Sequence, residues 1–211
     1  MVISDSLVVA TEKTKEDLQE LVFIIGKIQY ELFLKGILIR GGISFGKLYV
    51  NKSKNVIVGP GLINAYKLES IAKFPRIIID RKIIPEFFSS STDFVNFMNS
   101  TDKFNFDYEG EIDGRILFES ETMDGKFYIN FMRMVVRYGP TYQTRHLEKI
   151  TAFFQTNIYI NEYFEKYNWL VKELLRELHL ADIHYTTNVN ISSKTKRLNG
   201  IKKLRIFLEN L

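Results

Sequence analysis

Asp5 is the first residue whose type and position could do chemistry. It lies between Ser4 and Ser6, directly before the apolar run Leu7–Ala10. A carboxylate at a turn that feeds a buried strand can hold a hard divalent cation at the edge of a sheet. The Ser-Asp-Ser sequence fits an ordinary turn equally well. Asp5 is therefore a candidate metal ligand, with a plain turn as the alternative.

Arg40, Gly41 and Gly42 form a second candidate group. Paired glycines in a strand let a phosphate or another backbone approach closely, and they also occur at bulges and in tight strand packing. Arg40 adds a cation that could stabilise phosphate charge, although an arginine in a strand is more often structural.

A third group follows the sequence Gly59-Pro60-Gly61, which is typical of a helix start. The free amides of a helix N-terminus can face an anion. Asn64 and Lys67 are three residues apart, a spacing that places both polar side chains on one face of this helix.

The elements that must position these groups alternate between strands and helices. Apolar residues spaced by three and four predict a helix over Thr14–Lys35, where Thr14 and Asp17 resemble a capping box and Gly36 ends the helix. Leu7–Ala10 reads as a short buried strand before it. The other predicted elements are a strand pair within Ile37–Val50, a helix from Pro60 to Ala72 and a strand at Ile77–Ile79. This order predicts an α/β fold.

The second half of the chain changes in composition. Two Asp-Gly pairs, at Asp113 and Asp124, predict hairpin turns. A metal-binding loop is the alternative, and the turns are favoured because acidic residues at EF-hand spacing are missing. The strand-like run Phe127–Phe131 follows the second pair. A helical pattern then extends from Leu147 to Leu178, as one long helix or two joined ones. We expect three segments: residues 1–88 as the core, 89–139 as a hairpin extension packed on it, and 140–211 as a helical part with a basic tail.

Composition narrows the class of protein. The chain has 211 residues, 45% of them hydrophobic, and no cysteine, which excludes disulfides and thiolate chemistry. Its apolar runs are too short to span a membrane, and no basic leader segment follows Met1, so the sequence predicts a cytoplasmic protein. The net charge of +4 permits an anionic ligand.

The tail from Lys194 to Arg205 carries six basic residues and no acidic one. Such a segment could bind nucleic acid or acidic lipid, and a solvated cationic helix face is the favoured interpretation. We therefore do not expect nucleic acid as the main partner.

Taken together, the segments "SDSLVVA", "RGGISFG", "GPGLINAYKLES" and "FPRIIID" resemble the catalytic domain of class III nucleotide cyclases. The resemblance covers about the first eighty residues. It is closer still to the pyrimidine nucleotide cyclases of bacterial anti-phage (Pycsar-type) systems, in which segments similar to "DGKFYINFM" and to Trp169-Leu170 complete the chain.

The resemblance implies a ferredoxin-like α/β (α+β) core, followed by a β-hairpin region and a long helix. It implies conversion of UTP or CTP to the 3′,5′-cyclic monophosphate and pyrophosphate, with two Mg²⁺ or Mn²⁺ ions, in a head-to-tail homodimer whose product acts on an effector. The residues that it points to are Asp5 for metal, Asn64, Lys67 and Arg40 for catalysis, and Gly41, Gly42 and Tyr66 for the nucleotide.

Three departures from the family pattern affect this expectation. Lys67 stands where an arginine is usual and lacks the forked contact of a guanidinium, and Asn64 is one position later than the usual asparagine, with Ile63 in the aligned place. The family's first strand, with the first metal aspartate, has no counterpart before Asp5, so we expect the chain as it stands to be inactive. Either that strand lies upstream, or the chain is a degenerate copy of the scaffold, in which Glu12 or Asp80 could substitute only if the fold brings them close. The alternatives are a catalytically dead module that binds a nucleotide or regulates a partner and, more weakly, nucleic-acid binding through the basic tail.

Overall fold

The computed structural model describes residues 2–3, 6–51, 53–54, 56–99, 118–120, 125–136, 144–188 and 194–211. These residues combine helices with small sheets, so the expectation of a mixed α and β chain is confirmed. The chain divides into two compact units, each assembled from separate stretches. Among the described residues, the first unit holds 2–26, 39–99 and 118–129, and the second holds 27–38, 130–136, 144–188 and 194–211.

Helix α1, Lys15–Phe33, contributes residues to both units. At its start the Asp17 amide donates to Thr14 Oγ1 at 3.0 Å, and the Thr14 hydroxyl donates to the Asp17 carboxylate. At its end Gly36 has a φ of +79°, and the amides of Gly36 and Ile37 donate to the carbonyls of Phe33 and Leu32, both at 2.9 Å. This bond pair is a Schellman motif, so both predicted ends of the helix are confirmed.

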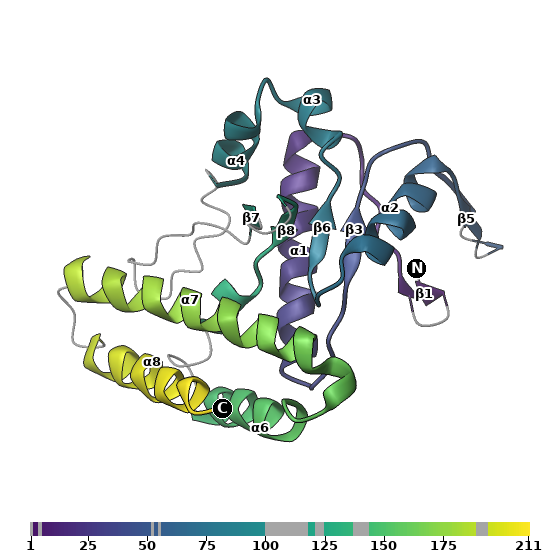
Figure 1. Ribbon diagram of the computed structural model, residues 1–211. Helices are drawn as coiled ribbons and strands as arrows, with labels where there is room; N and C mark the ends of the chain where they lie inside the picture. The colour runs from purple at the N-terminus through teal and green to yellow at the C-terminus, as the bar shows by residue number, and fades with distance from the viewer. Residues whose placement is uncertain are drawn as a thin grey trace. The chain divides into compact units, whose positions relative to one another are not determined.

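The first unit is built on a four-stranded sheet in the order β3-β6-β8-β7. Its strands are β3 (Gly41–Ile43), β6 (Ile77–Ile79), β8 (Phe127–Ile129) and β7 (Phe118–Ser120). β3 and β6 are parallel, and helix α2 (Pro60–Ile71) lies between them in the chain and packs against β3 (Figure 1). β8 runs antiparallel to both β6 and β7. The strand at Ile77–Ile79 and the helix from Pro60 are thus confirmed.

A hydrophobic core forms around this sheet. All three residues of β6 are buried, as the continuous β-branched run predicts. Helices α3 (Ile83–Phe87) and α4 (Ser91–Asn99) follow β6, and the ring of Phe94 contacts those of Phe88 and Phe127, with centroids 5.2 and 5.5 Å apart. These aromatic contacts join α4 to the sheet.

Two smaller antiparallel pairs complete the first unit: β1 (Val2–Ile3) with β2 (Ser6–Leu7), and β4 (Tyr49–Asn51) with β5 (Val56–Val58). The prediction of a buried strand at Leu7–Ala10 is wrong, since β2 ends at Leu7, and Leu7 and Val9 are exposed. In the part of the chain that the structure describes, β1 is the strand that β2 pairs with, and the two form a sheet of their own.

The predicted strand pair within Ile37–Val50 is also corrected. β3 and β4 belong to different sheets, because β3 pairs with β6 and β4 pairs with β5. The physical reason is the turn between them, where Gly46 has a φ of +154° and its backbone lies against that of Gly61. The chain therefore leaves the main sheet after Ile43 and builds a separate ribbon.

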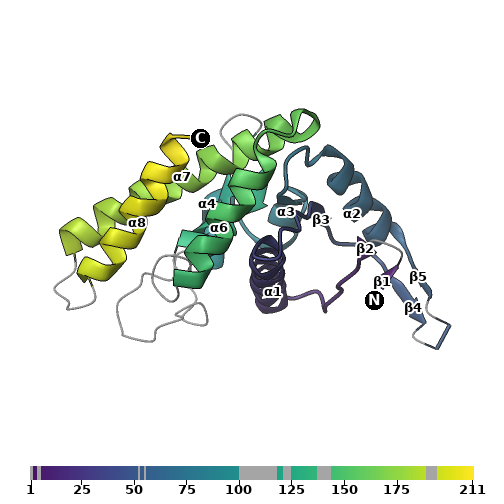
Figure 2. The same cartoon turned by 90° about the horizontal axis from the view of Figure 1, so that it is seen from below.

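The second unit is helical. It contains α6 (Thr144–Asn157), the short 3₁₀ helix η2 (Asn161–Tyr163), α7 (Phe164–Asn188), α8 (Lys194–Glu209), a short helix at 132–136 and the end of α1. Helices α6, α7 and α8 lie side by side (Figure 2) around buried Leu170, Leu174 and Leu204. The long helical pattern therefore forms two helices, one of the two predicted arrangements. No described helix is both long enough and apolar enough to cross a bilayer.

Candidate functional site

The glycine pair of β3 lies directly under helix α2. A Cβ added to Gly42 would lie 2.3 Å from Leu68 Cβ and 2.6 Å from the Ala65 carbonyl oxygen. At Gly41 the nearest atom, Ile77 Cγ1, would be 3.4 Å away, an ordinary contact. Close packing, one of the two interpretations of the pair, thus explains Gly42. A phosphate contact at these glycines stays a prediction.

The start of α2 is held by backbone contacts with the loop after β3. The Gly61 amide donates to the Lys47 carbonyl at 3.3 Å, and the Ser44 hydroxyl donates to the Gly61 carbonyl at 2.6 Å. Pro60, the first residue of α2, follows Gly59, whose φ is +146°, and has no N–H. Because the Gly61 N–H is already bonded to Lys47, two of the first three residues of α2 have no free amide to offer an anion.

Asn64 and Lys67 share one side of α2, as predicted from their spacing. Asn64 is half-buried and Lys67 is exposed, and Lys67 forms no ion pair with any residue that the structure describes. Tyr66 is 70% exposed and lies two positions from Asn64, a spacing at which helical side chains do not face each other. The helix therefore brings Asn64 and Lys67 together and points Tyr66 elsewhere.

Arg40 is engaged by the same helix. Its Nε lies 2.5 Å from Glu69 Oε1, and this ion pair links the residue before β3 to the last turn of α2. Arg40 thus already has an anionic partner within the chain, whereas Lys67 has none among the described residues. Of the two candidate cations, Lys67 is the one available to a ligand.

The carboxyl ends of the parallel strands β3 and β6 carry Ser44 and Asp80. The Asp80 amide donates to the Ile43 carbonyl at 2.9 Å, and its carboxylate accepts the Lys82 amide at 3.0 Å. Asp80 therefore stabilises the turn that leads into α3. Asp5 lies outside the described residues, between the paired residues Ile3 and Ser6 of the β1–β2 hairpin.

The described residues do not assemble a metal site by themselves. Within them, no three His, Asp or Glu side chains come close enough together to hold an ion. Glu12 and Asp80, the two candidate substitutes for a missing carboxylate, form no such group. A metal site at Asp5 therefore stays a prediction.

A set of cation–ring contacts near α1 was not expected from the sequence. The Lys13 ammonium lies 5.3 Å from the centroid of the Phe45 ring and pairs with Glu86, and the Lys15 ammonium lies 4.8 Å from the centroid of the Phe88 ring. Lys13 lies two residues before α1 and Lys15 is its first residue. The two lysines therefore join the start of the helix to the aromatic core of this unit. No periodicity reveals such contacts, because they link residues distant in the sequence.

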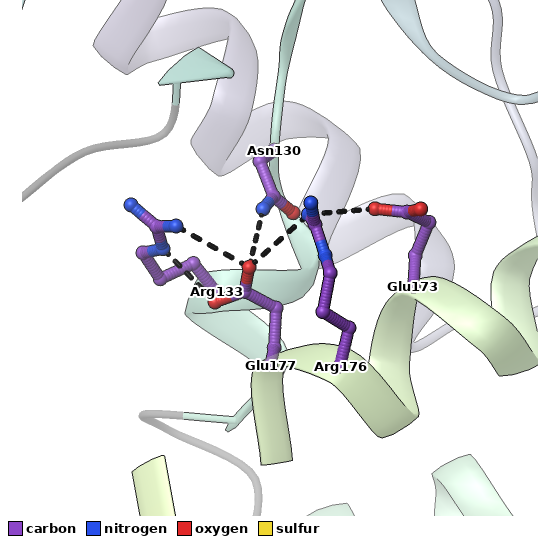
Figure 3. A network of polar contacts seen from close by, with 5 residues as sticks. All are labelled: Asn130, Arg133, Glu173, Arg176 and Glu177. Atoms are coloured by element: carbon purple, nitrogen blue, oxygen red, sulfur yellow. Dashed lines mark hydrogen bonds and ion pairs between the residues drawn. The ribbon is translucent and has the colours of Figure 1, made fainter. Parts of the chain in front are cut away.

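A second feature missed by the sequence interpretation is a polar network centred on Glu177 of α7 (Figure 3). Glu177 is 4% exposed, and it accepts hydrogen bonds from Asn130 Nδ2 at 2.7 Å and Arg133 Nε at 2.9 Å. Arg176 lies 3.4 Å from Glu177 and 2.8 Å from Glu173. Among the described residues, two guanidinium groups thus face two carboxylates, and these contacts fasten residues 130–133 to α7. Glu177 lies three positions after the buried Leu174, on the same side of the helix. This spacing is the sequence signal that could have indicated a buried carboxylate here.

The basic tail forms α8, which buries Ile201, Leu204 and Leu208 and exposes Lys202 and Lys203. Arg205 pairs with Asp182 at 3.4 Å and with Glu209 at 3.3 Å. The described part of this helix is therefore an amphipathic packing element, and nucleic-acid binding by it stays a prediction.

Comparisons of the chain with models of protein families, with curated proteins and with solved structures find no match.

Proposed function

We propose that this chain is a cyclase-type nucleotide domain that binds a pyrimidine nucleoside triphosphate, UTP or CTP, with the Asn64–Lys67 face of α2. Its chemistry is cyclisation: the ribose 3′-oxygen attacks the α-phosphorus, the bond to the β-phosphate oxygen breaks, pyrophosphate leaves and the 3′-hydroxyl proton is released. We propose this reaction because four segments of the chain resemble class III cyclases.

One observation carries the proposal furthest, namely the availability of Lys67. It is a cation on the same helix face as a polar amide, exposed and without an ion pair in the described part of the chain. Charge developing on a transferring phosphate is stabilised by a preorganised cation. Asn64, one turn away, would orient the ribose or a phosphate oxygen.

The order of elements around Lys67 supports the same proposal. A strand with a glycine pair, a β-ribbon, a helix and a parallel strand follow one another, and Gly42 lets the helix lie on the strand. This arrangement fixes α2 against the sheet and so fixes the positions of Asn64 and Lys67. A ferredoxin-like cyclase core is the finer fold that we propose for this unit.

Divalent metal would activate the 3′-oxygen and neutralise phosphate charge in this reaction. Because the described residues hold no metal site, the metal part of the proposal rests on Asp5 with a second carboxylate, and turnover requires both.

The proposed assembly is a head-to-tail homodimer, and the product would signal to an effector in anti-phage defence. The alternative function is a nucleotide-binding module without turnover, which the engagement of Arg40 by Glu69 favours, since it leaves a single candidate cation on this face.

The test measures binding and product formation in the same samples. The chain is incubated with each of the four ribonucleoside triphosphates and Mn²⁺, bound nucleotide is measured at equilibrium, and products are separated by chromatography. Cyclic product from UTP or CTP supports the enzyme. Pyrimidine binding without product is the result that we expect of this chain as it stands, and it supports nucleotide binding alone. If no triphosphate binds, both are wrong. Lys82→Met, which removes an exposed lysine outside α2, is the matched control for Lys67→Met.

A further inference from the structure

The positive charge of the chain is concentrated in residues 40–79. This segment carries seven basic residues and one acidic residue, whereas the rest of the chain carries 22 basic and 24 acidic residues. The acidic residue, Glu69, is paired with Arg40. The excess of positive charge therefore belongs to the part of the first unit that runs from β3 through the β4–β5 ribbon and α2 to β6.

The β4–β5 ribbon, residues 47–58, exposes apolar side chains on both of its sides. Four of them are 38 to 59% exposed: Tyr49, Val50, Val56 and Val58. Residues that pair across an antiparallel ribbon share a side, so Tyr49 and Val58 lie on one side, together with the pair of Asn51 and Val56. On the other side Val50 is exposed, although its partner Ile57 is buried. Apolar surface therefore faces solvent on each side of the ribbon.

The ribbon is a formed element. In the described part of the chain β4 and β5 pair with each other alone, and Figures 1 and 2 show the ribbon beside α2, projecting from the rest of the first unit. Its base is held by the bond from the Gly61 amide to the Lys47 carbonyl, at 3.3 Å. At its tip Asn51 Oδ1 accepts the Lys54 amide at 3.0 Å and the Ser53 hydroxyl at 2.8 Å. The exposed apolar side chains are thus held on an ordered ribbon.

The charge of the ribbon is entirely positive. Residues 47–58 contain three lysines and no acidic residue. Lys47 at the base and Lys54 at the tip are exposed, and neither forms an ion pair with any described residue. A surface that covers the ribbon must therefore offer negative charge together with apolar contact.

An anionic lipid surface offers both. Its headgroups attract lysines, and the boundary between headgroups and acyl chains takes up aliphatic side chains and tyrosine rings. It also surrounds an element embedded in it, whereas a flat protein surface would cover one side of the ribbon and leave either Tyr49 or Val50 in water. Nucleic acid would satisfy the lysines, but its interfaces with proteins are more polar, so the valines would gain little there.

We propose that the β4–β5 ribbon anchors the protein to membranes that contain anionic lipid. Because its tip carries the polar residues Asn51, Ser53 and Lys54, the ribbon lies along the membrane surface and does not enter tip first. The lysines lie in the headgroup layer and the apolar side chains reach the acyl boundary. The Asn64–Lys67 face of α2 takes no part in this contact, so the inference goes beyond the proposed function and does not depend on it.

The test is binding of the whole chain to vesicles without nucleotide, measured by co-sedimentation. The vesicles consist of phosphatidylcholine alone or contain about one third phosphatidylserine. We expect the wild type to bind the acidic vesicles at least about tenfold more tightly than the neutral ones, and added salt to weaken this binding.

Two double variants separate the two contributions. Lys47→Glu/Lys54→Glu should weaken binding to acidic vesicles at least about tenfold, since each lysine near such a surface contributes roughly fivefold. Tyr49→Ser/Val58→Ser should weaken it at least about tenfold by removing apolar contact. The matched controls alter residues of the second unit that are also exposed and should bind like the wild type: Lys172→Glu/Lys202→Glu and Tyr159→Ser/Ile160→Ser.

A fluorescence measurement locates the ribbon even if a double variant folds poorly. The chain has one tryptophan, Trp169, which is 6% exposed, so Tyr49→Trp adds a probe that can be compared with the wild type. We expect acidic vesicles with brominated acyl chains to quench the added fluorescence of Tyr49→Trp. The control Tyr159→Trp should not be quenched.

A wild type that does not bind acidic vesicles, or that binds neutral vesicles equally well, would overturn the proposal. Binding that both ribbon double variants retain would do the same, as would a Tyr49→Trp protein that binds without quenching. A wild type that binds polyuridylate RNA but no vesicle would overturn it in favour of nucleic acid.

Discussion

Gly42 of β3 lies so close to Leu68 of α2 that a Cβ on the glycine would be 2.3 Å from Leu68 Cβ. The helix that carries Asn64 and Lys67 therefore packs closely on the backbone of the strand at Gly42. This contact determines how far the candidate residues stand from the sheet.

Replacing Gly42 by alanine should consequently push α2 away from β3. Overpacking of a close contact costs about 1–3 kcal/mol and more where backbone must move, so we expect Gly42→Ala to lower the free energy of unfolding by at least about 2 kcal/mol. Gly41→Ala, where the nearest atom would be 3.4 Å away, is the control and should cost less. Urea denaturation measures both, and equal effects would contradict the packing explanation.

Lys67→Met should weaken the action of the site on phosphate while leaving the fold unchanged, since the methionine keeps most of the apolar stem. Affinity for the nucleotide should fall at least about tenfold, and if the charge also acts at the transition state, turnover falls roughly ten- to a thousand-fold as well. Arg40→Met, which breaks the exposed pair with Glu69, should cost at most about 1 kcal/mol of stability and leave nucleotide binding unchanged. A loss of nucleotide binding in Arg40→Met, with binding unchanged in Lys67→Met, would assign the phosphate-binding role to Arg40 instead.

Asp5→Ala should abolish the dependence of nucleotide binding on divalent metal, because a methyl group cannot coordinate an ion. Titration with Mn²⁺ at fixed UTP or CTP checks this for the wild type and the variant, and Asp93→Ala, an exposed carboxylate on α4, serves as the control. Identical metal dependence in wild type and Asp5→Ala would remove Asp5 from the metal site.

Glu177→Gln should destabilise the helical unit strongly. The glutamine keeps the shape but removes the charge that faces Arg133, and breaking a buried ion pair costs about 3–5 kcal/mol. Glu165→Gln, at an exposed position near the start of the same helix, should be neutral. Thermal melting of the two variants decides, and equal melting temperatures would mean that the network contributes no net stability.

The helices were predictable because their signals are local. Thr14, Asp17 and Gly36 marked both ends of α1, and Pro60 marked the start of α2, since caps and turn glycines act on their own neighbours in the chain. The β-branched residues of β6 likewise identified a buried strand.

Pairing between strands was not predictable to the same degree. The apolar run after Ser6 looked like a buried strand, but burial depends on which strand lies beside it, and among the described strands β2 pairs with β1 alone. The separation of β4 from β3 depends on the backbone contact of Gly46 with Gly61, which no sequence periodicity encodes. The candidate pair Asn64 and Lys67 was predictable, because helix geometry alone sets their relation, whereas the engagement of Arg40 by Glu69 required the fold.

The central claim is that the α2 face acts on a pyrimidine nucleoside triphosphate, and equilibrium binding tests it most directly. Binding of UTP and CTP to the 211-residue chain is titrated with Mn²⁺ for the wild type, Lys67→Met, Asn64→Ala and the control Lys82→Met. We predict saturable binding by the wild type and by Lys82→Met, with affinity at least about tenfold weaker in Lys67→Met and also reduced in Asn64→Ala. Absence of binding by the wild type, or equal affinity in all four proteins, would contradict the assignment of this helix face to the nucleotide.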